Sequence, residues 1–169
     1  MSVSFRGETI CLEEGVDVGY EVEKIRLSSC GGGEFSAPTR GVTTLLLCAP
    51  VLDEKSLKEL HELDSEFGSR GVLNFETVFV LSGSQTPPEG FGFIKFAMDD
   101  KDEFGLEFGV KIDSGALSGC LAKAVFAISR DHILYYKEIC KDVEESFTMD
   151  RLYMQLGKAL NVYTGTGCH

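Results

Sequence analysis

A strand, a proline turn, a capped helix and a second strand follow one another between residues 43 and 81, and this order most constrains the fold. Thr43–Cys48 is a continuous run of β-branched and apolar residues, which is typical of a strand covered on both faces. Asp53 is a favourable N-cap for a helix that ends near Arg70 and Gly71. Phe75–Leu81 is a second buried strand. The unit therefore predicts two parallel strands joined by a helix.

The predicted helix has two faces of opposite character. Its apolar stripe is formed by Leu57, Leu60, Leu63 and Phe67. Its solvated face is expected to carry Glu59, Glu62 and Glu66. This pattern indicates a helix that packs one side against the sheet.

The rest of the chain supplies further strands and helices. Residues 22–27 and 93–97 are predicted strands, and residues 124–129 and 133–139 form a predicted antiparallel hairpin. Residues 102–108 predict a short helix, and residues 150–163 a final helix with apolar positions at 152, 156, 159 and 160. Residues 82–92 predict a loop, because Pro87-Pro88 and three glycines exclude a helix interior.

A small β-hairpin is predicted in front of these elements, within residues 1–13. The order of strands and helices that follows resembles the thioredoxin architecture, an α/β fold of three layers in which helices flank a central mixed sheet. No repeat or linker splits the chain, so residues 1–169 are expected to form one domain, with a flexible tail at 164–169.

The charge and the apolar pattern exclude some classes of partner. The chain has 27 acidic and 16 basic residues, a net charge of −11, and no basic patch, so we expect no nucleic-acid partner. The N-terminus lacks a basic flank before an apolar run, and Pro50 interrupts the longest apolar stretch. We therefore expect neither a signal peptide nor a membrane span.

The cysteines and glycines give no sign of a metal or a cofactor. Six cysteines are scattered along the chain without a Cys-x-x-Cys pair or a histidine at zinc-ligand spacing. Without an export signal they are expected to be free thiols in a reducing, cytoplasmic compartment. Cys30-Gly31-Gly32-Gly33 predicts a turn and not a phosphate-binding loop, because no lysine-serine pair or helix start follows it.

Several segments carry a family resemblance along nearly the whole chain. They are Ser4-Phe5-Arg6-Gly7, Leu27-Ser28 with Gly33-Glu34-Phe35-Ser36, Ala49-Pro50-Val51-Leu52-Asp53, and above all Phe108-Gly109-Val110 with residues 115–126. On these residues the sequence resembles the thiol peroxidases, the atypical two-cysteine peroxiredoxins. The resemblance implies a thioredoxin-like fold, hydroperoxide reduction and a homodimer.

The same resemblance implies that the catalytic site of the family is altered here. The family motif Pro-x-x-x-Thr-x-x-Cys matches Pro50, but its threonine position holds Glu54 and its cysteine position holds Leu57. An arginine of the family falls on Lys123, and the 82–92 loop replaces the helix with the resolving cysteine. Leucine cannot act as a nucleophile, and a nearby carboxylate disfavours a thiolate. We also hypothesise that Glu54 and Lys123 form an ion pair.

Other thiols are candidates for a relocated nucleophile. Cys48 ends the central strand, at the sheet edge where α/β proteins place their chemistry, although a cysteine in such a run more often packs in the core. Cys120 is expected to face away from Lys123. Cys11, Cys30 and Cys140 are expected in or beside exposed turns, and Cys168-His169 lies on the tail, where nothing orients the imidazole. His61 and His132 are expected to be solvated.

Two hypotheses of different classes follow. In the first, the chain is a family member without the catalytic cysteines that acts by binding a protein partner or a small ligand in the former peroxide pocket. In the second, it is an active, thiol-dependent peroxidase with a relocated cysteine such as Cys48. Neither hypothesis requires a metal or a cofactor.

Overall fold

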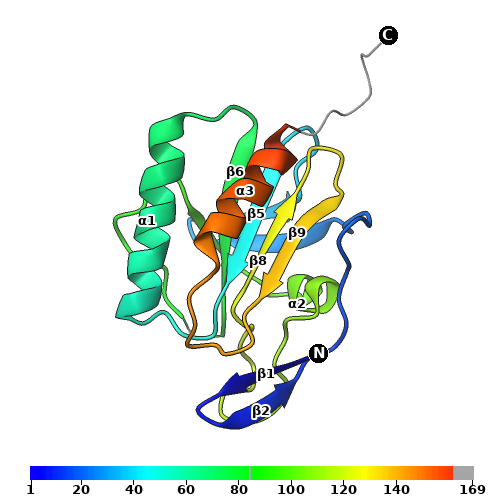
Figure 1. The fold of residues 1–169 in the computed structure, drawn as a ribbon, viewed down its shortest axis with the longest axis vertical. Helices are drawn as coiled ribbons and strands as arrows, with labels where there is room; N and C mark the ends of the chain where they lie inside the picture. The colour runs from blue at the N-terminus through cyan, green and yellow to red at the C-terminus, as the bar shows by residue number, and fades with distance from the viewer. Residues whose placement is uncertain (84, 162–169) are drawn as a thin grey trace.

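The protein is built around one seven-stranded mixed sheet, seen in a computed structural model that describes residues 1–83 and 85–161 (Figure 1). The strands lie in the order β4-β3-β7-β6-β5-β8-β9. Their bounds are β3 Ile25–Ser29, β4 Glu34–Ala37, β5 Thr43–Cys48, β6 Phe75–Leu81, β7 Lys95–Met98, β8 Ala124–Ile128 and β9 Leu134–Ile139. The three helices are α1 Glu54–Arg70, α2 Glu103–Phe108 and α3 Met149–Leu160.

The predicted strand-helix-strand unit is the centre of the fold. Strands β5 and β6 pair in parallel, from Thr43 opposite Phe75 to Cys48 opposite Val80, and all six residues of β5 are buried. The helix α1 begins after Asp53, whose carboxylate accepts a hydrogen bond from the Ser56 N–H, and it ends at a left-handed Gly71. The predicted antiparallel hairpin is confirmed as β8 and β9.

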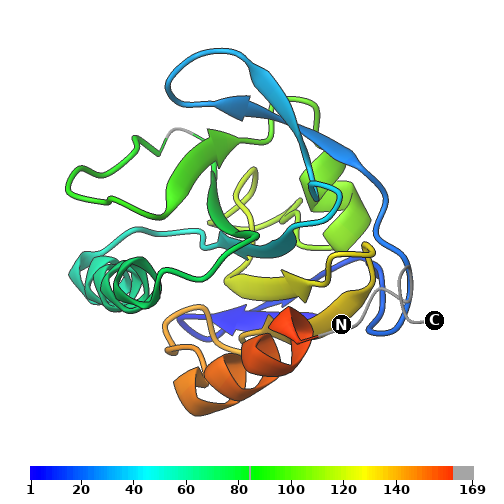
Figure 2. The same cartoon turned by 90° about the horizontal axis from the view of Figure 1, so that it is seen from above.

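The sheet separates two apolar cores. Helices α1 and α3 cover one face, and α2 lies on the other, as the view from above shows (Figure 2). Because side chains alternate along β5, Leu45 and Leu47 pack towards α1 while Leu46 and Cys48 pack in the core that includes α2. The arrangement is the expected thioredoxin-like α/β fold.

An N-terminal hairpin and the segment after it close one end and one edge of the sheet. Strands β1 Ser2–Phe5 and β2 Glu8–Cys11 form the predicted hairpin, and the Ser4 N–H donates to the Lys141 carbonyl at 2.6 Å. Further on, Gly19 and Val22 donate backbone hydrogen bonds to Leu134 and His132, beside β9. Residues 19–22 therefore cover the outer edge of the sheet at the start of β9.

Some predicted boundaries are wrong. Strand β4 was not predicted, and β3 begins at Ile25 and not at Val22. In β4, four residues lie between a glycine run and Pro38, too few to show a clear alternation. The predicted 164–169 tail lies outside the described residues. None of the helices in the described part combines the length and apolar character needed to cross a bilayer.

Candidate functional site

The connection after β5 and the first turn of α1 together carry three of the four positions that the resemblance assigns to the site. Pro50 is buried, Glu54 is exposed and Leu57 is half-buried. The Asp53 cap closes the turn, and its bond from the Ser56 N–H holds the pKa of the Asp53 carboxyl below its usual value. The helix therefore begins with a satisfied carboxylate and without a thiol.

Lys123, the fourth position, forms a buried ion pair with Glu59. Its Nζ lies 3.3 Å from Glu59 Oε1, and the two side chains are only 3% and 8% exposed. The same Nζ lies 4.9 Å from the centre of the Phe147 ring. The hypothesis of an ion pair between Glu54 and Lys123 is therefore wrong: Glu59, one turn further along α1, is the partner.

The burial of Glu59 also corrects the predicted helix faces. Glu59 was expected on the solvated face, but it lies four residues before Leu63 and eight before Phe67, on the edge of the apolar stripe. The position of Glu59 in the sequence therefore indicated the buried face of the helix, but its charge favoured the solvated face. The buried ammonium of Lys123 makes this burial tolerable, because each charge compensates the other.

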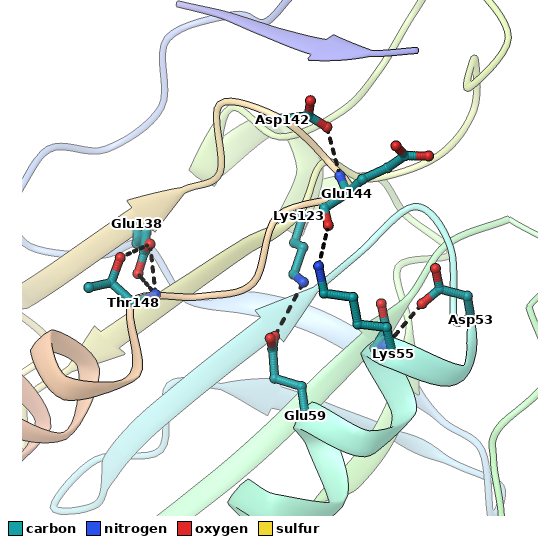
Figure 3. A network of polar contacts seen from close by, with 9 residues as sticks. Asp53, Lys55, Glu59, Lys123, Glu138, Asp142, Glu144 and Thr148 are labelled. Carbon is teal, nitrogen blue, oxygen red and sulfur yellow. Dashed lines mark hydrogen bonds and ion pairs between the residues drawn. The ribbon is translucent and has the colours of Figure 1, made fainter.

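The loop at 141–148 covers this ion pair and is itself fixed at both ends. Lys55 Nζ donates to the Glu144 carbonyl at 2.9 Å, and the Glu144 N–H donates to Asp142 (Figure 3). At the other end, Glu138 accepts from the Thr148 N–H and hydroxyl. The loop thus presents the Phe147 ring to Lys123 from a fixed backbone.

A second set of hydrogen bonds ties the turn before α1 to the 82–85 segment. Gln85 Nε2 donates to the carbonyls of Ala49 and Pro50, at 3.2 and 3.1 Å. The buried Ser82 hydroxyl donates to the Ala49 carbonyl and accepts from the Leu121 N–H. Sequence reasoning missed Gln85 and Ser82, whose only signal was polarity within a proline- and glycine-rich loop.

Cys48 is a core residue. Its side chain is fully buried, its Sγ donates to the Ala122 carbonyl at 3.1 Å, and burial raises the pKa of the thiol far above its usual value. A thiol in this environment is a poor nucleophile because the thiolate is strongly disfavoured.

Cys140 was expected to be exposed, and this expectation is wrong. It is 4% exposed and packs in the core beneath α1 and α3. Burial raises the pKa of its thiol to about 12, and the positive charge of Lys123 offsets only part of this effect. The signal for burial was its place directly after a strand that packs against the final helix.

The remaining described thiols are exposed or partly buried. Cys11 and Cys30 are exposed, as expected, and burial raises the pKa of Cys30. Cys120 is partly buried against the core on the α2 face, whereas Phe147, the neighbour of Lys123, packs on the α1 face. Cys168 and His169 lie outside the described residues.

Of the two described histidines, His61 is exposed, as expected, and His132 is only half-buried. His61 is exposed, but its ring stacks on Phe91 with the centroids 4.1 Å apart. His132 adopts a left-handed conformation, with φ 69°, and its buried Nε2 has no hydrogen-bond partner within the described chain. Among residues 1–83 and 85–161, no three acidic, cysteine or histidine side chains gather in a way that could hold a metal ion.

The sheet order, the position of α1 after β5 and the N-terminal hairpin define a thioredoxin-like α/β protein. Two solved structures with this fold resemble it closely. A peroxiredoxin-like protein from Aquifex aeolicus aligns with a TM-score of 0.76 and 19% identity, over 94% of this chain and 96% of that one. A thiol peroxidase from Chromobacterium violaceum aligns with a TM-score of 0.77 and 16% identity, over 93% and 95%.

Sequence comparison adds homology to the shared fold. The chain is 29% identical to a thiol peroxidase of Campylobacter jejuni, over 99% of its own length and 98% of that protein. It is 24% identical to a thiol peroxidase of Helicobacter pylori, over 85% and 91%. No family model matches the chain. The two sequence matches indicate homology between this chain and thiol peroxidases.

Proposed function

We propose that this protein is a thiol peroxidase homologue that has lost peroxidase chemistry at the start of α1 and acts by binding. One observation carries the proposal: the half-buried Leu57 occupies the first turn of α1, where the family resemblance places the catalytic cysteine. A hydrocarbon side chain cannot attack a peroxide oxygen. The homology explains the fold, and the substitution explains why the chemistry does not follow from it.

The surrounding charges support this proposal. Peroxide reduction needs a thiolate, which a helix N-terminus and a nearby cation normally stabilise. The nearby cation here is Lys123, and its charge is already compensated by Glu59 at 3.3 Å. The exposed Glu54 adds a negative charge at the same helix end. The site therefore offers little net positive potential to a thiolate or to a developing anion.

The described cysteines do not replace the missing thiol well. Cys48 and Cys140 are buried with raised thiol pKa values. Cys11, Cys30 and Cys120 lie in the N-terminal hairpin, in the β3–β4 turn and on the α2 side of the fold. A relocated peroxidase, the rival hypothesis, would need one of these thiols to ionise without the help of a helix terminus.

The surface beside Leu57 suits a binding role. Val51 is 42% exposed, and Leu52 and Leu57 are half-buried, so these residues present an apolar surface at the start of α1. The hydrogen bonds from Gln85 to the carbonyls of Ala49 and Pro50 hold the backbone of this surface in place. We propose that a protein partner or a small apolar ligand binds here.

A peroxide-consumption assay tests the proposal. Purified protein is given hydrogen peroxide or cumene hydroperoxide, with a thioredoxin and reductase system as the electron donor. We expect no turnover above the background without protein, both for the wild type and for Cys48→Ser. Robust wild-type turnover that Cys48→Ser abolishes, while the matched Cys11→Ser leaves it intact, would establish the relocated peroxidase instead.

A repair series tests the role of the charges. In Leu57→Cys alone, we expect a feebly reactive thiol, because the Glu54 and Glu59 carboxylates oppose its ionisation. Adding Glu54→Thr and Glu59→Gln should lower the pKa of the new thiol and raise its rate of peroxide reduction. The pH dependence of alkylation measures that pKa, and equal values in the single and triple variants would show that these charges do not matter.

The homodimer and the cytoplasmic location implied earlier are also part of this proposal. The free described cysteines agree with a reducing compartment. Sedimentation equilibrium of the purified chain measures its oligomeric state, and a monomer at all accessible concentrations would exclude the dimer.

A further inference from the structure

A pocket opens at the amino ends of β6 and β7, and none of its lining residues comes from the first turn of α1. Its volume is about 680 Å³, within the range usual for small-molecule sites. Residues 29–36, at the tip of the β3–β4 hairpin, form one wall. Glu76 and Lys95, at the start of β6 and β7, line the pocket together with Phe96 and Pro87. The pocket is thus separate from the site beside Leu57, and the inference does not depend on the proposed function.

The pocket exists because the β3–β4 hairpin leaves the sheet early. β3 pairs with β7 only through Ser28 opposite Met98 and Ser29 opposite Ala97, and the hairpin then curves away from β6 and β7 (Figure 2). The Cys30 N–H donates to the Phe96 carbonyl at 3.3 Å and holds the tip in place. At Gly32, φ is +102°, and no atom lies near the place of an absent Cβ. The positive φ lets the tip turn tightly. The absence of neighbouring atoms shows that the space beside Gly32 is open.

Glu76 gives the pocket an unused negative charge. Its side chain is half-buried, and its Oε1 accepts one hydrogen bond, from the Thr44 hydroxyl at 3.0 Å. Within the described residues, no lysine, arginine or histidine nitrogen lies within 4.0 Å of this carboxylate. A carboxylate has about four acceptor positions, so most of its capacity is free.

The other charges of the pocket are screened more strongly. Glu34 is exposed and forms an ion pair with Lys101, whose Nζ lies 3.9 Å from its carboxylate. Lys95 is exposed, so water screens its ammonium. Glu76 is therefore the least solvated charged group that lines the pocket, and the overall charge of −11 also favours a cation.

The apolar part of the pocket is aromatic. Phe35 and Phe96 are both half-buried and both line the pocket. A phenyl ring or an alkyl chain can pack against them, and their electron-rich faces also attract cations. We propose that this pocket binds small amphipathic organic cations, with the ammonium group at Glu76 and the apolar body against Phe35 and Phe96.

A matched pair of probes tests the charge requirement. Phenethylamine and 3-phenylpropionate have similar rings and chains but opposite charges, and both can be titrated into ¹⁵N-labelled protein. We expect phenethylamine to shift the amide resonances of residues 31–33 and 96 saturably. We expect 3-phenylpropionate to bind at least about tenfold more weakly, because Glu76 repels its carboxylate. Absence of saturable shifts, or equal binding of both probes, would overturn the proposal.

Variants and salt test the role of Glu76. In Glu76→Gln we expect the affinity for phenethylamine to fall about fivefold, while Glu62→Gln, an exposed change of the same chemistry on α1, leaves it unchanged. High ionic strength should weaken the binding of phenethylamine to the wild type. This test does not depend on the folding of a variant. Unchanged affinity in a well-folded Glu76→Gln, or in the wild type at high salt, would contradict the assignment of Glu76.

Discussion

At the scale of single residues, Lys123 and Glu59 form a buried ion pair against α1. Two charges have been taken from water into a position beneath the 141–148 loop, where they satisfy each other at 3.3 Å. The Phe147 ring adds a favourable contact for the ammonium group. Neither charge is free to serve an external anion while the pair is intact.

The pair gives a double-mutant cycle with a clear expected result. Glu59→Leu or Lys123→Met alone should lower the free energy of unfolding by about 3 kcal/mol, because each leaves a buried charge unpaired. The double variant should recover most of that loss. Chemical denaturation measures all four proteins. As a control, Arg70→Met in the exposed pair of Glu66 and Arg70 should lower the free energy of unfolding by only about 0.5 kcal/mol. If the double variant of the buried pair lost as much stability as the two single variants together, the coupling would be refuted.

At the scale of elements, the central strands and the helix between them could be predicted from local sequence patterns. A short strand and a long-range ion pair could not. Two apolar runs predicted the parallel pairing of β5 with β6, and Asp53 was the predicted N-cap of the helix between them. The structure confirms the pairing and the cap. Strand β4 is too short to show a clear alternation, and the charge of Glu59 favoured the solvated face because its partner Lys123 lies far along the chain. In the site, the residue types at 54, 57 and 123 were readable, but the true partner of Lys123 required coordinates.

Asp64 shows how one helix residue holds a distant loop. Its carboxylate accepts hydrogen bonds from the N–H groups of Gly92, Phe93 and Ile94, at 3.1, 2.8 and 2.7 Å. Burial acts to raise the pKa of this carboxyl, but the three hydrogen bonds outweigh it and the pKa is lowered. The loop before β7 is therefore tied to α1 by a charge.

This anchor should give the protein a specific acid sensitivity. A lowered pKa in the folded state means that Asp64 stabilises the fold above its unfolded pKa of about 3.9 and loses this effect as the pH falls through the lower, folded value. At neutral pH, Asp64→Asn should cost about 1–2 kcal/mol of unfolding free energy. The difference from wild type should shrink in acid. Denaturation at several pH values measures this, with Glu62→Gln as the control; a pH-independent difference would argue against the anchor.

At the scale of the whole molecule, two cores share one sheet. Cys48 lies in the core on the α2 face and Cys140 in the core beneath α1 and α3, and both are almost inaccessible. The strands β5 and β8 contribute side chains to both cores, so the two faces are expected to unfold together. The two thiols thus report on opposite sides of one unit.

Pulsed alkylation at increasing denaturant tests this cooperativity. We expect Cys11 and Cys30 to react in the native protein, and Cys48 and Cys140 to become reactive together at the midpoint of unfolding. Peptide mass spectrometry follows each site separately. Two distinct midpoints for Cys48 and Cys140 would show that the faces open independently.

The cover that residues 19–22 place over β9 has a consequence for self-association. A sheet with two open edges can add copies at both ends and grow without limit. Here the backbone of Gly19 and Tyr20 bonds with Leu134, the first residue of β9, and Val22 bonds with His132 just before it, so β4 is the more open edge of the sheet in the described chain. Two molecules that join through β4 cover that edge on both, which favours a pair over a fibre.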